Sequence, residues 1–308
     1  MGKDDPMSQV AILANPAACS GRAASNVHLV VDRLRRHGIE PLILDTSSAD
    51  AARAAAVHAV ATGIQRLVVF GGDGIVQIAA DAAAGSAAVV GLVAGGTGND
   101  AAEALGLQGG TLDDKVDQAL GDPVSVDLIS DGNRHAITSC VVGFPAAVNV
   151  RAEALRFPRG PARYTLATLA ELPAMRPDRY RLILDGEVVE LTAAVVVVAN
   201  TAFFGGGMRI CPDADPADGL LDVCVVGEVG RLSLLRSFAK VRTGAHLDHP
   251  DVSMFKAATV EIEVIQSTDY EALVRADGEP FGSLPCSLRA RPGAIWVARA
   301  QTTPPGRT

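Results

Sequence analysis

The feature that most constrains the fold is an alternation of short apolar runs with amphipathic segments over the first 128 residues. Strand-like runs are expected at 9–14, 41–44, 66–70 and 88–93. Helix-like segments are expected at 22–37, 49–62 and 75–84. Near-continuous valine and leucine runs between helices are typical of a parallel sheet covered on both faces. We therefore expect residues 1–128 to form an α/β domain.

The pattern changes at about residue 129, where turn signals become frequent. Asp-Gly dipeptides begin at positions 131, 185, 218 and 277. Between them lie apolar or alternating segments at 136–142, 180–184, 188–198, 221–226, 259–265 and 284–289. We expect residues 129–293 to form a mostly antiparallel β-sandwich, interrupted by helices near 161–175 and 231–241. Residues 294–308 are expected to hold a C-terminal strand and a disordered tail.

A glycine-rich loop, Gly71-Gly72-Asp73-Gly74, joins the third expected strand to the third expected helix. Glycines let the backbone approach a phosphate group, and the free N–H groups of a helix start favour negative charge. The loop is neither a Walker loop nor a dinucleotide fingerprint. An ordinary tight turn is the alternative. The carboxylate of Asp73 argues against it, because it would repel phosphate unless it held Mg²⁺ or oriented a network.

A second glycine-rich loop follows the fourth expected strand and reads Gly95-Gly96-Thr97-Gly98-Asn99-Asp100. The helix-like segment 101–105 comes directly after it. Two successive strand–glycine–helix junctions place two helix starts at one edge of a parallel sheet, where ligands of α/β proteins bind. A simpler alternative is that Asn99 or Asp100 only caps the helix.

Acidic residues mark two candidate sites in the second half of the chain. The segment 213–222 holds four aspartates, which suit Mg²⁺ or Ca²⁺ but also suit a solvated turn. Asp277 lies between apolar neighbours and is a candidate proton acceptor. The alternative for Asp277 is a hairpin turn, since Asp-Gly is a common turn dipeptide and the chain contains five of them.

Composition limits the partners and the compartment. The formal net charge is -8, which argues against nucleic acid. An anionic membrane would have to be met by local basic groups. Two sets of basic residues are candidates: Arg151, Arg156, Arg159 and Arg163, then Arg231, Arg236, Lys240 and Arg242. The alternative is that they form the solvated basic faces of packed helices. Five cysteines without CxxC spacing indicate a reduced, cytoplasmic protein. The longest apolar run, 193–199, is too short to span a bilayer.

The two glycine loops together resemble the catalytic domain of the diacylglycerol kinase and bacterial lipid kinase family. Further stretches agree with this resemblance, which spans about residues 9–298: Asn15-Pro16 with Ser20-Gly21, Asn200 with Gly205-Gly206-Gly207-Met208, the segment 212–222, and Ala276-Asp277-Gly278-Glu279-Pro280. Each motif alone is unspecific, but the combination is specific.

The resemblance implies a kinase of two domains. An N-terminal α/β domain like that of NAD kinase and phosphofructokinase would hold ATP, and the β-rich domain would hold a diacylglycerol-like lipid. Phosphoryl transfer to the lipid hydroxyl would occur in the cleft between them. The implied cofactors are ATP and Mg²⁺. The implied partner is a membrane lipid, met by transient contact at the membrane surface. The oligomeric state, including a homodimer, stays open.

Matched residue by residue, the resemblance assigns roles to individual positions. Asp277 corresponds to the general base. Asp215, Asp218 and the backbone carbonyl of Leu220 correspond to a structural Mg²⁺ site. Nucleotide contacts correspond to Thr46, Gly71, Gly72, Asp73, Gly74, Gln77, Gly96, Thr97, Asn99 and Asp100.

The chain departs from the family pattern just after the first glycine loop. The family loop continues Thr-x-Asn-Glu, whereas this chain has Ile75-Val76-Gln77-Ile78. Ile75 cannot donate a hydrogen bond to phosphate, and Ile78 replaces a carboxylate. This favours an alternative, a catalytically weak nucleotide- or lipid-binding homologue. An NAD kinase is the other alternative, although the second glycine loop and the late Asp-Gly-Glu segment fit lipid kinases better.

Overall fold

The computed structural model describes residues 9–14, 23–96, 99–155, 157, 161–231, 233–234, 240–266 and 273–299. The chain divides into two compact units. Unit 1 comprises residues 1–126 and 293–308, and unit 2 comprises residues 127–292. Two long strands, β5 (Asp122–Ser130) and β18 (Cys286–Arg299), contribute residues to both units.

Unit 1 contains a parallel sheet, as the alternation of apolar runs predicts. Its strands run in the order β2 (Leu42–Ile43), β1 (Val10–Ala14), β3 (Arg66–Gly71) and β4 (Val89–Ala94), and all of these pairs are parallel. The last part of β18 adds a further parallel pair, through Trp296 and Val297 beside β4. The predicted α/β class of this part of the chain is therefore confirmed.

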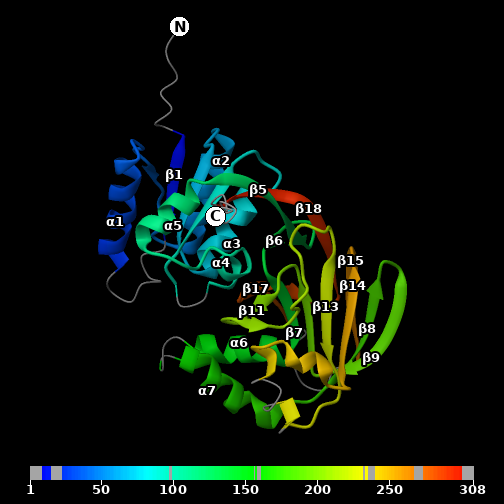
Figure 1. The fold of residues 1–308 in the computed structure, drawn as a ribbon. Coiled ribbons are helices and arrows are strands. Elements are labelled where there is room, and N and C mark those ends of the chain that lie inside the picture. The colour runs from blue at the N-terminus through cyan, green and yellow to red at the C-terminus, as the bar shows by residue number, and fades with distance from the viewer. Residues whose placement is uncertain are drawn as a thin grey trace, which may run out of the picture. The chain divides into compact units, whose positions relative to one another are not determined.

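Helices cover both faces of this sheet (Figure 1). They are α1 (Ala23–Arg36), α2 (Ala49–Ala61), α3 (Asp73–Ala83), α4 (Asp100–Ala104) and α5 (Leu112–Ala119). Leu34 of α1 and Val116 of α5 share one core with Ile12 and Val68 of the strands, so α1 and α5 lie on the same face. Helix α5 packs so closely on β4 that a Cβ at Gly91 would lie 2.3 Å from the carbonyl oxygen of Ala119.

Unit 2 contributes to two large sheets, through pairs that are antiparallel, and it also holds a small two-stranded sheet. The first joins β15 (Thr259–Gln266), β8 (Asp178–Leu184) and β9 (Glu187–Ala193) to the first part of β18. The second has the order β14 (Val252–Ala257), β13 (Leu221–Val226), β10 (Val195–Ala199), β7 (Ser139–Gly143), β16 (Leu273–Ala276) and β17 (Glu279–Ser283). Short strands β6 (His135–Ala136), β11 (Phe203–Phe204) and β12 (Met208–Arg209) complete the described set.

Strand β10 explains why unit 2 has two cores. Val196 and Val198 pack with Leu182 and Ile262 between the sheets, which makes the predicted β-rich sandwich. Val195 and Val197 face the opposite way, into a core shared with α6 (Phe144–Ala154) and α7 (Pro161–Glu171). A strand that is buried on both faces needs an unbroken apolar run, and the sequence 195–199 supplies it.

The structure corrects several expected boundaries. The segment 188–198, expected as one strand, is two: β9 ends at Ala193 in one sheet and β10 begins at Val195 in the other. An apolar run continues across the junction, so hydropathy did not reveal the break. Helix α3 begins at Asp73, two residues earlier than expected. The sequence reasoning missed α5, α6 and β14.

Other expectations fall partly outside the described residues. These are the turn at Asn15 to Gly21, most of the helix at 231–241, and the tail from residue 300. Within the described part of the chain, no helix is long and apolar enough to cross a membrane. The described cysteines, Cys140, Cys211, Cys224 and Cys286, are free thiols.

Candidate functional site

The predicted nucleotide contacts of unit 1 gather at one edge of its sheet. Thr46 follows β2, Gly72 follows β3, and Gly95 follows β4. These strands are parallel, so their carboxyl ends lie at the same edge. That edge is where ligands of open α/β sheets bind.

The first glycine loop passes directly into α3. Gly72 is the residue before the helix, in an extended conformation, and Asp73 and Gly74 form its first turn. The first N–H groups of a helix have no partner within it and carry partial positive charge. Ile75 and Ile78 are only 5% and 6% exposed, so these departures from the family pattern contribute to the core of unit 1.

The two glycine loops are joined by a hydrogen bond. The backbone N–H of Ala101 in α4 donates to Oδ1 of Asp73, over 3.2 Å. Asn99 makes no side-chain cap on α4. Its Oδ1 instead accepts from the N–H of Gly96 (3.2 Å) and its Nδ2 donates to the carbonyl of Gly96 (2.9 Å). Asp73 and Asn99 therefore organise the loops, whereas Thr97 lies outside the described residues.

A cation that the sequence reasoning did not single out lies beside the second glycine loop. Lys115 of α5 donates from Nζ to the carbonyl oxygen of Ala94, the last residue of β4, over 3.0 Å. The ammonium group is thus held one residue before Gly95. Only the packing of α5 on β4 brings it there, so no local motif could have indicated it.

The carboxylate of Asp277 is held by four donors from one short stretch of unit 2. Oδ1 accepts from the backbone N–H of Thr138 (2.9 Å), the hydroxyl of Thr138 (2.5 Å) and the backbone N–H of Ser139 (3.3 Å). Oδ2 accepts from the backbone N–H of Ile137, over 2.8 Å. Among these contacts Oδ2 takes a single donor, so it keeps capacity for a further hydrogen bond.

Asp277 combines the backbone of a tight turn with a desolvated carboxyl group. Its φ is 50°, in the left-handed region that costs a non-glycine residue about 1–2 kcal/mol. Burial raises the pKa of its carboxyl group above the ordinary value, while hydrogen bonds led by that of the Thr138 hydroxyl act in the opposite direction. Backbone strain and a desolvated carboxylate are both frequent at functional sites.

Other buried polar groups support the stretch that holds Asp277. Asn200, which is 1% exposed, donates from Nδ2 to the carbonyl oxygens of Asp127 (2.8 Å) and Ile137 (3.0 Å). Arg275 donates to the carbonyl of Gly278 (2.7 Å) and forms an ion pair with Glu153 of α6. The Asp277-Gly278 turn is thus fixed from both sides.

The acidic turn at 213–222 is held by protein groups. Asp215 Oδ1 accepts from the N–H of Ala217 (3.1 Å), and Asp218 Oδ1 accepts from the N–H of Leu220 (2.9 Å). Asp218 Oδ2 lies 2.9 Å from Nζ of Lys256.

Asp218, one of the residues that the resemblance assigns to Mg²⁺, already pairs with an ammonium group through Oδ2. Across the described residues, no three side chains of His, Cys, Asp or Glu come together to hold a metal. The assignment of Asp215, Asp218 and Leu220 to Mg²⁺ therefore stays a prediction from the resemblance.

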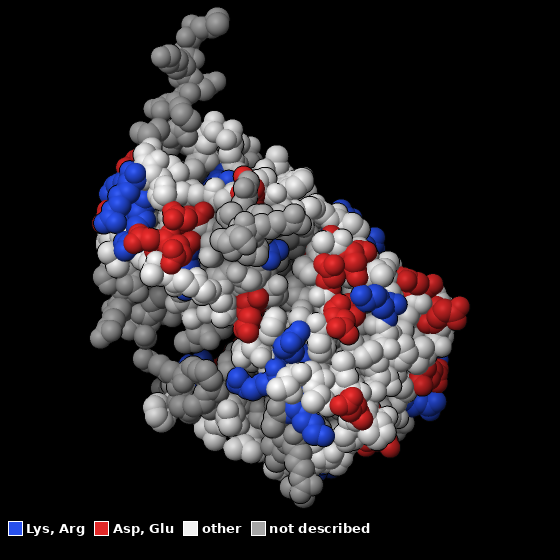
Figure 2. Space-filling view, viewed as in Figure 1, with Lys and Arg blue, Asp and Glu red and all other residues white. Residues whose placement is uncertain are grey.

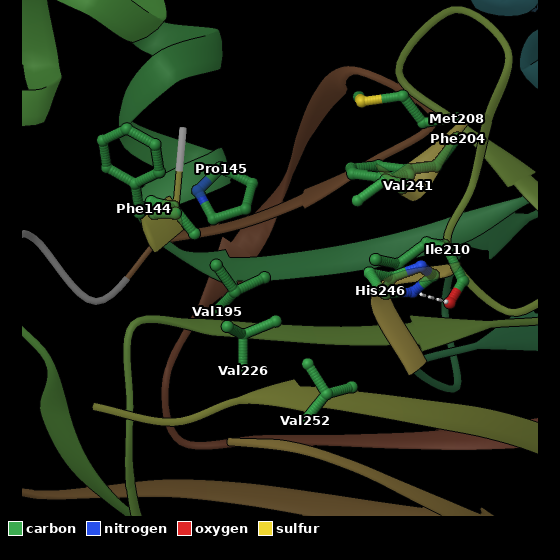
Figure 3. Close-up of a pocket in the computed structure, with 11 residues that line it drawn as sticks. Phe144, Pro145, Val195, Phe204, Met208, Ile210, Val226, Val241, His246 and Val252 are labelled. Carbon is green, nitrogen blue, oxygen red and sulfur yellow. Dashed lines mark hydrogen bonds between the residues drawn. The ribbon is translucent and has the colours of Figure 1, made fainter. Parts of the chain in front are cut away.

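Unit 2 also contains an apolar pocket with a cavity of about 40 Å³ (Figure 3). Its wall comes from α6, β10, β13, β14 and the segments between them: Phe144, Pro145, Val195, Phe204, Met208, Ile210, Val226, Leu234, Val241, His246 and Val252. His246 donates from Nε2 to the carbonyl of Ile210, over 3.0 Å, because a carbonyl can only accept. Burial lowers the pKa of His246, so the apolar surrounding disfavours the charged imidazolium.

Charged side chains of opposite sign lie beside each other on the face drawn in Figure 2. Arg151, one of the basic residues considered for lipid head groups, pairs with Glu171 of α7 over 2.5 Å. Its pairing favours the alternative of a solvated helix face at this position. Arg156, Arg159 and Arg236 lie outside the described residues.

Comparison with known proteins identifies both halves of the chain. Residues 9–130 match the family model of the diacylglycerol kinase catalytic domain, and residues 138–299 match that of the YegS C-terminal NAD kinase beta sandwich-like domain. A diacylglycerol kinase of Mycobacterium tuberculosis is 36% identical over 302 residues, covering 95% of this chain and 96% of that protein. A diacylglycerol kinase of Bacillus subtilis is 24% identical over 294 residues, covering 91% and 92%.

The fold has also been seen in a solved structure. A crystal structure of a diacylglycerol kinase from Bacillus anthracis has a TM-score of 0.73 at 21% identity, covering 98% of this chain and 100% of that one. At this identity the likeness concerns the fold, while the sequence matches carry the family. The chain therefore belongs to the diacylglycerol kinase and bacterial lipid kinase family, and it is a lipid kinase.

Proposed function

We propose that this lipid kinase transfers the γ-phosphoryl group of ATP to the hydroxyl of a diacylglycerol-like lipid, with Asp277 as the general base. Transfer would take place in the cleft between the two units, as the resemblance implies. The observation that carries the proposal is the desolvated carboxylate of Asp277, which donors from 137–139 hold in one orientation.

Unit 1 would hold the nucleotide at the carboxyl edge of its sheet. The start of α3 offers N–H groups to the phosphates, and the Asp73–Ala101 hydrogen bond keeps the second loop beside the first. Lys115 lies close enough to that loop to add positive charge. Mg²⁺ bound with ATP would neutralise charge on the phosphates during transfer.

Asp277 would accept the proton of the lipid hydroxyl through Oδ2. As the hydroxyl oxygen bonds to the γ-phosphorus, ADP leaves and the proton passes to the carboxylate. A general base must be ionised before it can accept a proton, and a raised pKa makes it a better acceptor. The Thr138 hydroxyl would fix the orientation of the carboxylate through Oδ1.

The apolar pocket of unit 2 would receive the end of one acyl chain. About 40 Å³ accommodates a few water-sized groups, so it suits part of a chain rather than a whole lipid. The remainder of the lipid would stay near the membrane, so the kinase would work as a cytoplasmic protein at the membrane surface. Burying each methylene of the chain contributes roughly 0.8 kcal/mol.

The test is to supply ATP labelled in its γ-phosphate together with vesicles that contain diacylglycerol, ceramide or a sphingoid base. NAD in a parallel reaction serves as the competing acceptor. We expect label in a lipid product and none in NADP. ATP binding with no labelled lipid from any of the three pools would refute the proposed activity and favour the catalytically weak homologue.

A further inference from the structure

The acidic turn of unit 2 contains a cation of its own. Lys256 lies on β14 and is paired in register with Asp222 of β13. Its Nζ is 2.9 Å from Oδ2 of Asp218 and 3.4 Å from Oδ2 of Asp222. One ammonium group therefore lies between Asp218, which the resemblance assigns to the structural metal site, and Asp222, which it does not assign.

The environment of these groups favours a charged lysine. Asp222 is only 6% exposed, so its carboxylate needs a nearby cation or donor to offset the loss of water. Lys256 supplies that cation through its contacts with both carboxylates. The lysine is itself partly exposed, so solvent weakens the pair without removing it.

The rest of the turn is closed by the protein backbone. Oδ2 of Asp127 on β5 accepts from the N–H of Gly219, over 2.7 Å. The N–H of Asp127 donates to the carbonyl of Pro216, also over 2.7 Å. These bonds hold the turn against β5 through contacts that involve no ligand.

We propose that the ammonium of Lys256 takes the place of the divalent cation in this chain, so that unit 2 folds and stays stable without a bound metal. Mg²⁺ requires a near-octahedral set of oxygens at about 2.0–2.1 Å. At Oδ2 of Asp218 it would compete with the ammonium of Lys256, because two positive charges at one carboxylate oxygen repel each other. This substitution of lysine for metal concerns the stability of unit 2 and does not depend on the proposed role of Asp277.

Thermal unfolding and metal content of the nucleotide-free protein test this inference. We expect the wild-type Tm to be the same in EDTA and in millimolar MgCl2, and elemental analysis after dialysis to find no stoichiometric metal. Lys256→Met should lower the Tm by about 2–4 °C in EDTA. Magnesium should restore part of that loss, because the variant frees the carboxylates of Asp218 and Asp222.

The matched control is Lys240→Met, at an exposed lysine, which should change neither the Tm nor its response to magnesium. A wild-type Tm that rises with magnesium, and no longer does so in Asp218→Asn, would overturn the proposal. If magnesium leaves the Tm of Lys256→Met unchanged, the claim that the ammonium takes the place of a metal ion is overturned. If that variant does not fold, the wild-type measurements still decide, and lipid phosphorylation is not needed for either result.

Discussion

Replacing Asp277 by Asn separates catalysis from turn formation. The amide is nearly the same size, but its NH₂ group must stand at one of the two carboxylate positions. At Oδ2 it would face the N–H of Ile137, and at Oδ1 it would face the N–H and hydroxyl of Thr138. A buried donor left without an acceptor costs roughly 1–3 kcal/mol. We therefore expect a folded protein with a Tm lower by about 2–4 °C per kcal/mol.

The loss of activity should be much larger than the loss of stability. A general base contributes typically 10²–10⁴-fold to the rate, so the kcat for lipid phosphorylation should fall by about that factor. Nucleotide affinity should stay at the wild-type value, because Asp277 belongs to unit 2 and the proposed phosphate loops to unit 1. The assay combines labelled-lipid formation at saturating ATP, a nucleotide titration and thermal unfolding.

Asp185 provides a matched control within the same chain. It also precedes a glycine, has a φ of 49°, and accepts from the N–H groups of Ala258 (3.0 Å) and Thr259 (2.7 Å). Asp185→Asn should reduce stability by less, because water can solvate the amide at this exposed position, while kcat stays at the wild-type value. Retained turnover in Asp277→Asn would refute the general-base role. An equal loss of kcat in Asp185→Asn would refute it as well.

Three further predictions address the loops, the proton acceptor and the packing of unit 1. Asp73→Ala should raise the Kd for ATP by about tenfold in a titration, the equivalent of 1.4 kcal/mol, since it removes the bond to Ala101; an unchanged Kd would contradict this role. Thr138→Val removes a hydrogen bond that lowers the pKa of Asp277, so the acid limb of kcat/KM should move to higher pH, because the base works only when ionised. Thr138→Ser keeps the hydroxyl and should leave the limb in place. Gly91→Ala should lower stability by roughly 1–3 kcal/mol in urea unfolding, because its Cβ would overlap the Ala119 carbonyl.

The sequence predicted the layered architecture because burial leaves a direct mark on composition. Strands buried on both faces, such as β3 and β10, require unbroken apolar runs, and both runs were visible. The break between β9 and β10 was not visible, because Ala193 and Ala194 continue the run while the chain passes from one sheet to the other. Hydropathy reports burial, but it does not report which sheet a strand joins.

The site was predictable where its residues are adjacent in the chain, as in the two glycine loops. It was not predictable where packing brings distant residues together. Thr138 is 139 residues from Asp277, Lys256 is 38 residues from Asp218, and Lys115 is 21 residues from Ala94. No spacing rule relates such pairs. A threonine or lysine outside a motif carries no local signal of its partner.

The two interpretations of Asp277, turn residue and proton acceptor, prove to be compatible. The left-handed backbone that makes Asp-Gly a good turn also directs the carboxylate back onto the N–H groups of residues 137–139. Asp185 uses the same backbone and the same kind of hydrogen bonds to hold a hairpin together. The two residues differ in surroundings, since the Asp277 carboxyl group is desolvated, whereas the carboxylate of Asp185 makes its hydrogen bonds at an exposed position. A turn that is already rigid gives a proton acceptor its orientation before the substrate arrives, so little reorganisation is left for the transfer step itself.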